Sequence, residues 1–169
     1  MNTYFYIWAF LLLIFLGLYI LIYRLLSSKI NKTEKYIVDI FLQKISKIPS
    51  VIEVMRPYVS DTKIAFDLMT HLHSEWIIYE YSSIHSLLEH NARINDQYWF
   101  LMRLSMAIPV LQKDAYFLYI RDFVMSYDLE MKKQLPIMNN LFHKWNRFVR
   151  IKNATIIGYI LPGREVVEL

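Results

Sequence analysis

Residues Met1–Tyr23 carry no charged side chain, and from Tyr4 onward the chain is a continuous run of mostly large apolar residues. About 20 helical residues at 1.5 Å each cover the roughly 30 Å hydrocarbon core of a bilayer. Aromatic residues at both ends of the run are typical of the membrane–water interface. A cleaved signal peptide would have a basic start, a shorter apolar part and a small-residue cleavage site, which are absent here. The pattern predicts a single N-terminal transmembrane helix, with residues 1–28 as the anchor.

Basic residues follow the apolar run directly, with a single acid, Glu34, among them. They are Arg24, Lys29, Lys32 and Lys35. Only the terminal amine precedes the run, and positive charge beside a span favours the cytoplasmic side. We therefore expect a single-pass protein with its N-terminus outside and its C-terminal domain in the cytoplasm.

Beyond residue 36 the apolar positions recur in alternating steps of four and three, which is typical of a helix with one buried face. The first such stripe consists of Phe41, Ile45, Ile48, Ile52, Met55 and Val59. Pro49 and Pro57 interrupt it, and each is expected to kink a helix or to lie near its end.

A second helix is expected from an N-cap at Ser60 or Asp61 to about His90. Asn91–Asn95 is typical of a turn. A short helix over Gln97–Met106 then ends before the next proline.

The longest stripe lies near the C-terminus and runs over more than four heptads, as in a long bundle or coiled-coil helix. Its members are Phe117, Ile120, Val124, Tyr127, Met131, Gln134, Met138, Leu141, Trp145 and Phe148. Because the register is kept across Pro136, we expect one kinked helix with Asp114 as its N-cap.

Three glycines and five prolines are too few for many short strands and tight turns. The sequence therefore predicts an all-α fold: one transmembrane helix, then an antiparallel bundle of three to four long helices over residues 29–152. The apolar tail at residues 153–169 is too short to span a bilayer. It would cap the bundle, lie at an interface or bind a partner.

Catalytic and cofactor motifs are missing from the sequence. With no cysteine, disulfides, thiolate metal sites and cysteine nucleophiles are excluded. Phosphate-binding glycine loops, nucleophile elbows and dinucleotide fingerprints are absent as well. The net charge of +4 is too small for a dedicated nucleic-acid binder, so no nucleic acid is expected. We expect a protein that is not an enzyme and has no cofactor.

Two alternatives remain open. His71 and Glu75 share a helix face and are weak candidates for metal ligands, with His85 and His90 as further members of a bundle-core ligand or metal site. No third ligand is evident nearby, and a polar bundle face is the better explanation of the pattern. The other alternative is a lipid-surface binder that uses the basic end of the last helix. Its basic residues are Lys144, Arg147, Arg150 and Lys152.

Five short segments follow one another over about forty residues of the C-terminal part: Ile108-Pro109-Val110-Leu111, Phe117-Leu118, Asp128, Met138-Asn139 and Trp145-Asn146. In their order and spacing they resemble the LemA family of bacterial membrane proteins. Further back, Ile48–Glu53 is similar to the family's Ile-Pro-Asn-Leu-Val-Glu. The family's Tyr-Asn pairs are replaced here by Met-Asn and Trp-Asn, and Pro136 is extra, so the chain resembles a divergent member.

The resemblance implies a single anchor, a long-helix bundle and no catalytic residues. Asn139 and Asn146 lie two turns apart on one face, where asparagine more often fixes helix register than binds a ligand. We expect a membrane-anchored scaffold at the bacterial inner membrane. Its partners would be the lipid bilayer and proteins, in a multiprotein envelope or secretion complex or a homo-oligomer. Candidate contact residues are Asn139, Asn146, Trp145, Lys144, Arg147 and Arg150.

Overall fold

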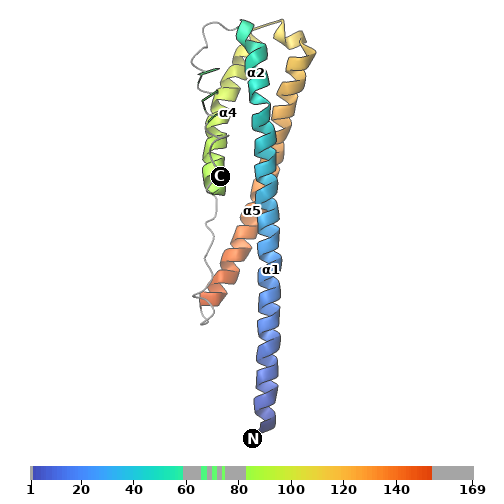
Figure 1. The fold of residues 1–169 in the computed structure, drawn as a ribbon, viewed down its shortest axis with the longest axis vertical. Coiled ribbons are helices and arrows are strands. Elements are labelled where there is room, and N and C mark those ends of the chain that lie inside the picture. Colours follow the sequence, from blue (N-terminus) through green and yellow to red (C-terminus); the bar gives the residue numbers. More distant parts are fainter. Residues whose placement is uncertain (1, 59–65, 68–69, 72–73, 75–82, 154–169) are drawn as a thin grey trace. The chain divides into compact units, whose positions relative to one another are not determined.

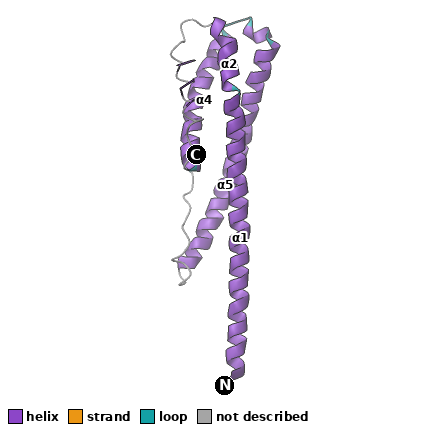
Figure 2. Cartoon of the chain, in the orientation of Figure 1, coloured by secondary structure: helices purple, strands orange, loops and turns teal. Residues whose placement is uncertain are grey.

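The computed structural model describes residues 2–58, 66–67, 70–71, 74 and 83–153. Within these ranges every regular element is a helix and no strand is present (Figures 1 and 2). The elements are α1 (Asn2–Ser46), α2 (Ile48–Met55), η1 (Arg56–Tyr58), α4 (Ile84–Met106), η3 (Leu111–Lys113) and α5 (Ala115–Asn153). The predicted all-helical class is confirmed for this part of the chain.

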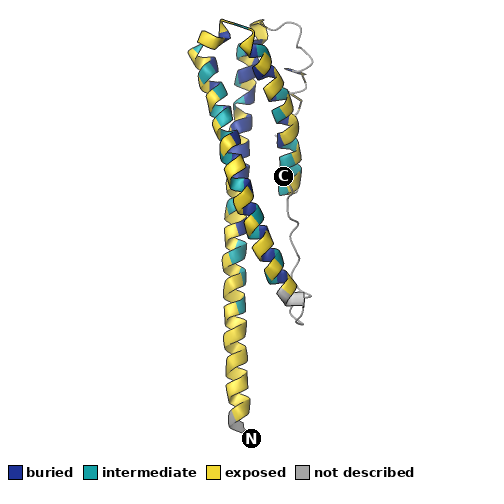
Figure 3. Cartoon of the chain, turned by 180° about the vertical axis from the view of Figure 1, so that it is seen from behind, coloured by how far each residue is buried: buried dark blue, intermediate teal, exposed yellow. Residues whose placement is uncertain are grey.

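Helix α1 begins with the predicted apolar segment. Every side chain from Tyr4 to Leu18 is exposed, and Figure 3 shows that the N-terminal part of the helix is almost entirely surface. Of the described helices, this is the one that is long and apolar enough to cross a membrane.

Contacts divide the chain into two compact units, to which α1 and α5 both contribute. Unit 1 comprises residues 1–35 and 136–169, and unit 2 comprises residues 36–135. One of the boundaries falls at Pro136, where α5 lacks a backbone N–H and therefore one helical hydrogen bond.

Two prolines set the helix ends in the first part of unit 2. Helix α1 ends at Ser46, and α2 begins at Ile48 with Pro49 in its first turn, where a missing N–H costs no helical bond. Pro57 lies in η1, directly after α2. Both prolines therefore lie at helix ends, as expected. The predicted stripe is buried at Phe41, Ile45, Ile48, Ile52 and Met55, and Val59 lies outside the described residues.

Helix α4 corrects the prediction for the middle of the chain. It starts with a capping box in which the Ser83 hydroxyl accepts from the Ser86 N–H and the Ser86 hydroxyl accepts from the Ser83 N–H. It then continues through Asn91–Asn95, so the predicted turn there is wrong. The helix ends at Met106 ahead of Pro109, as expected. The N-cap predicted at Ser60 or Asp61 lies outside the described residues.

Helix α5 begins after Asp114, whose carboxylate accepts from the Phe117 N–H at 2.9 Å. The predicted cap is thereby confirmed. The helix continues through Pro136 as one element, which confirms a single helix here.

The buried stripe of α5 differs from the predicted one at alternate positions. Its buried members are Phe117, Ile120, Val124, Asp128, Met131, Leu135, Met138, Phe142, Trp145 and Val149. Tyr127, Gln134, Leu141 and Phe148 are only half-buried. The buried face is thus rotated slightly from the predicted stripe, and it includes a carboxylate, that of Asp128.

Candidate functional site

A lysine is buried in the interior of unit 2. Lys44 lies three residues after Phe41 on α1, and none of its side chain is exposed. Its ammonium nitrogen contacts a carboxylate oxygen of Asp128 on α5 at 2.6 Å. Burying an unpaired charge is very costly, so the surroundings of this lysine must supply compensation.

Two asparagines complete that compensation. The ammonium donates to the side-chain oxygen of Asn91 at 2.8 Å and also to the side-chain oxygen of Asn95. The two residues are one turn apart on α4 and therefore share a face. An ammonium has three N–H donors, and Asp128, Asn91 and Asn95 supply three acceptors. We call these four residues the Lys44 cluster.

Two opposing effects act on the pKa of Lys44. Removal from water disfavours the charged form and lowers the pKa below its ordinary value, and this effect is the larger. The carboxylate of Asp128 opposes it through charge attraction and a hydrogen bond, whereas Lys132 adds a small further lowering. The ion pair therefore offsets a part of the burial cost.

Tyr98 is the next residue of the same α4 face and is fully buried. Its hydroxyl donates to the Arg121 carbonyl of α5 at 3.3 Å. Burial raises the pKa of Tyr98 well above its usual range, and the nearby Asp128 charge adds to the rise. A neutral hydroxyl thus extends the polar contacts between α4 and α5.

The Lys44 cluster is suited to fixing how helices pack and is unsuited to turnover. All three ammonium donors have acceptors, and the nitrogen is enclosed. A hollow of about 430 Å³ in unit 2 is lined by other residues, including Pro49, Ile52 and Pro57. Lys44 is not among the residues that line this hollow.

Sequence reasoning missed this cluster because it placed charged and amide side chains outside the core. The residue types at Asn91 and Asn95 favour a turn, and Asp128 stands out in the sequence only as the match to a family glutamate. A usable signal was present in the spacing. Lys44 follows Phe41 by three and precedes Ile48 by four, while Asp128 follows Val124 by four and precedes Met131 by three.

The predicted metal candidates are only partly within the described residues. His71 is exposed, and Glu75 lies outside the described residues, so their pairing stays a prediction. His85 contacts Glu89 at 3.4 Å on the surface, and the His90 ring packs edge-on to Phe41. Among the described residues, no three His, Asp or Glu side chains lie close enough together to hold a metal ion.

The predicted asparagine and tryptophan positions all belong to unit 1. Asn139 and Asn146 are half-buried, and no described donor reaches the buried side-chain oxygen of Asn139. Trp145 is buried, with its ring centre 5.4 Å from that of Tyr23. Phe148 stacks on Tyr19 at 4.7 Å. The end of α5 therefore contacts α1 where the apolar run ends.

The predicted basic positions of α5 lie on its surface. Lys144, Arg147 and Arg150 are all exposed, and none of them forms an ion pair with a described acid. Their contact with lipid or with a partner stays a prediction.

Comparison with known proteins gives no relative: no family model, no curated protein and no solved structure matches the chain.

Proposed function

We propose that this protein is a non-enzymatic scaffold that is anchored in the bacterial inner membrane by α1 and docks protein partners through its helical domain. The observation that carries the proposal is the apolar half of α1, which is exposed from Tyr4 to Leu18. Each large apolar side chain gains roughly 1.5–3 kcal/mol when it leaves water. Such a surface is therefore stable in a bilayer and unsuited to water.

The charges beside this segment support an orientation. No charged side chain precedes Tyr23, whereas Arg24, Lys29 and Lys32 follow it closely. Cytoplasmic flanks of membrane helices are enriched in such cations. The proposed topology has the N-terminus outside and the helical domain in the cytoplasm.

We further propose that the domain is an antiparallel bundle of three to four long helices and a divergent relative of the LemA family. Support for the packing comes from the Lys44 cluster, to which α1, α4 and α5 each contribute side chains. Support for the family remains the Ile48–Glu53 segment and the spacing of Asn139 and Asn146.

A row of aromatic side chains on α5 supports docking of proteins. Tyr116 and Tyr119 are more than half exposed, and the rings of Tyr119, Phe123 and Tyr127 follow one another at 6.1 and 4.6 Å. The Lys47 ammonium lies 5.2 Å from the Phe123 ring centre. Tyrosine and other aromatic residues are enriched at protein interfaces, so this row is the proposed contact surface.

Two measurements test the function. After alkaline carbonate treatment of membranes, the full chain should stay in the membrane pellet. A photo-crosslinking residue at Tyr119 should then capture a discrete neighbour in cells, whereas the same residue at Arg93, an exposed position on α4, should not. Release by carbonate would overturn the anchor. A lone monomer in detergent without any crosslinked neighbour would overturn the scaffold.

A further inference from the structure

Directly after the apolar run, α1 carries a polar stripe that borders an open hollow of about 470 Å³. The polar side chains that line it are Arg24, Ser27, Ser28, Asn31, Lys32 and Lys35. All of them belong to unit 1, and none is acidic. The volume lies within the roughly 300–1,000 Å³ of small-molecule sites.

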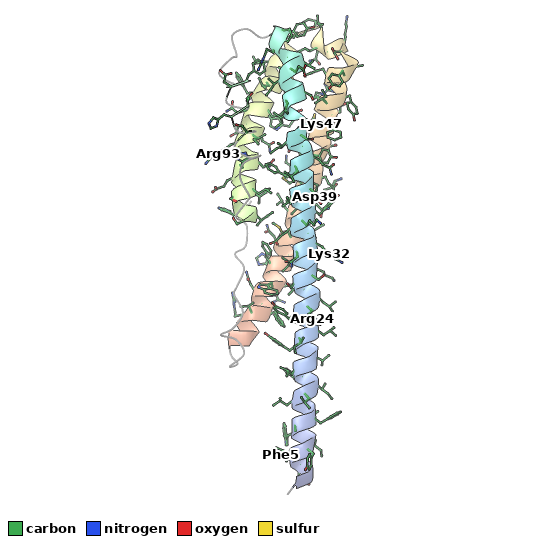
Figure 4. The ribbon with its side chains drawn as sticks, viewed as in Figure 1. Phe5, Arg24, Lys32, Asp39, Lys47 and Arg93 are labelled. Carbon is green, nitrogen blue, oxygen red and sulfur yellow. The ribbon has the colours of Figure 1, made fainter. Side chains whose placement is uncertain are left out.

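Helical spacing places the principal members of this stripe on one face. Arg24, Ser28, Asn31 and Lys35 follow one another in steps of four, three and four, so they lie almost in line along the helix. Lys32 and Ser27 flank this line on either side. Figure 4 shows Arg24 and Lys32 on α1, both C-terminal to the apolar part that contains Phe5.

The depth of the stripe relative to a bilayer follows from its distance to the apolar run. Beyond the hydrocarbon core, each leaflet has a polar layer roughly 5–8 Å thick. With a rise of 1.5 Å per residue, Arg24, Ser27 and Ser28 fall within this layer when Tyr23 lies at its inner edge. Lys32 and Lys35 lie one to two turns further out, and their long side chains can extend back to it.

The donor set points to a phosphate. A guanidinium binds phosphate oxygens with two parallel N–H donors, ammonium groups supply point charges, and serine hydroxyls donate single hydrogen bonds. Arg24, Lys32 and Lys35 form no ion pair with a described acid, so no described carboxylate competes for them.

Aromatic contacts border the same turn of α1. Tyr23 also lines the hollow, and its ring packs on that of Trp145, while Tyr19 stacks on Phe148 one turn earlier. Tyrosine and tryptophan favour the depth of the headgroups. The aromatic rings and the cations therefore both fit the headgroup layer of a bilayer.

We propose that this hollow binds the phosphate headgroup of an anionic phospholipid. The site rests on the proposed membrane anchoring and adds a lipid class to it. Arg24 clamps the phosphate, Ser27 and Ser28 donate hydrogen bonds to it, and the two lysines attract its negative charge. A zwitterionic headgroup is bound more weakly because its own cation meets the same lysines.

The experiment uses the full chain in nanodiscs of phosphatidylcholine mixed with phosphatidylglycerol. Lipids that stay bound after transfer to detergent are quantified by mass spectrometry. The variant R24Q/K32Q/K35Q removes the site, and R93Q/R103Q/K113Q removes the same number of exposed positive charges from unit 2. The site variant lacks three cations that attract an anionic headgroup, so it should lose at least roughly tenfold in phosphatidylglycerol enrichment.

The wild type and the control variant should both retain phosphatidylglycerol over phosphatidylcholine, and the site variant should not. Equal retention by all three proteins would overturn the site. A second measurement compares how much inorganic phosphate and phosphatidylglycerol each stabilise the detergent-solubilised wild type against heat. Equal stabilisation by the two would identify a free phosphate as the ligand and would overturn the proposed lipid site as well. Release by carbonate would overturn the anchor itself, whereas retention in the membrane without lipid selectivity overturns the headgroup site alone.

Discussion

The ammonium nitrogen of Lys44 lies 2.6 Å from a carboxylate oxygen of Asp128, and 84 positions of sequence separate the two residues. The lysine side chain is fully enclosed, and that of Asp128 is 9% exposed. The pair joins α1 to α5 within unit 2, and Asn91 and Asn95 join Lys44 to α4. A buried pair contributes little net stability compared with apolar residues, yet it penalises every arrangement that separates its charges.

Asp128→Asn should strongly destabilise the protein. The substitution keeps the shape of the side chain and removes the charge that compensates Lys44. Leaving a buried charge without its partner costs about 3–5 kcal/mol. Urea unfolding of the detergent-solubilised protein, followed by circular dichroism, measures the loss.

The matched control for this substitution is Asp122→Asn. Its carboxylate pairs with Arg121 at 2.7 Å on the surface, where its side chain is 64% exposed. Surface pairs contribute about 0–1 kcal/mol, so the control should change stability little. Equal losses in the two variants would contradict a buried role for Asp128.

Replacing both charges should restore much of the stability lost with one. In K44M/D128L, neither charge has to be removed from water on folding, although Asn91 and Asn95 lose a donor. We expect a coupling free energy of at least about 2 kcal/mol in the double-mutant cycle, measured by the same urea titration. Additive single losses would show that the two side chains do not act as a pair.

The lowered pKa of Lys44 predicts a pH dependence of stability. Between the lowered folded value and the ordinary unfolded value, the unfolded chain holds a proton that the folded chain has released. The free energy of unfolding therefore rises with pH through this alkaline window. The free energy of unfolding should therefore rise more with pH in the wild type than in K44M/D128L, which has no lysine at position 44.

Tyr98 has the opposite effect on the pH dependence of stability, so the experiment needs a control for it. Because its pKa is raised on folding, its contribution is present below its ordinary value of 10.0 and is lost as pH rises above that value. Both proteins are therefore compared in a Tyr98→Phe background. Parallel pH curves of the free energy of unfolding in that background would contradict the lowered pKa of Lys44.

Local signals made much of the fold predictable. These signals determine helix positions and helix ends within a few residues of themselves. They are the uncharged apolar run, the prolines Pro49 and Pro109, and the capping aspartate Asp114. The Lys44 cluster was not predictable in this way, because the identity of the partner decides whether a charge is buried. Asp128 lies inside because it pairs with Lys44. Asn91, which is buried, and Asn95, which is half-buried, accept hydrogen bonds from the same ammonium within a helix.

The cap of α5 offers a local test. The Asp114 carboxylate accepts from the Phe117 N–H at 2.9 Å and also lies at the positive end of the helix dipole. Asp114→Ala should cost about 1 kcal/mol in the free energy of unfolding. Asp96→Ala, at an exposed interior position of α4, is the control and should have a much smaller effect. A larger loss at Asp96 would contradict the cap.

Pro136 lies in the middle of α5, and its side chain is exposed. It removes one backbone hydrogen bond, and its ring disfavours regular helix geometry. Alanine at this position would restore the N–H that bonds the Lys132 carbonyl. Proline disfavours a helix interior by about 3 kcal/mol relative to alanine, and the substitution should recover a part of this. Pro136→Ala should therefore raise the free energy of unfolding.

Hydrogen exchange locates the effect of this substitution. The amides of the turns on either side of position 136 should exchange more slowly in Pro136→Ala, whereas those of α4 should not change. Ile137→Ala, at an adjacent exposed position, is the control that leaves the backbone hydrogen bonds intact. If Pro136→Ala instead destabilised the protein and exchange became faster at both ends of α5, the expected gain would be contradicted, because the restored hydrogen bond would then cost more in packing than it contributes.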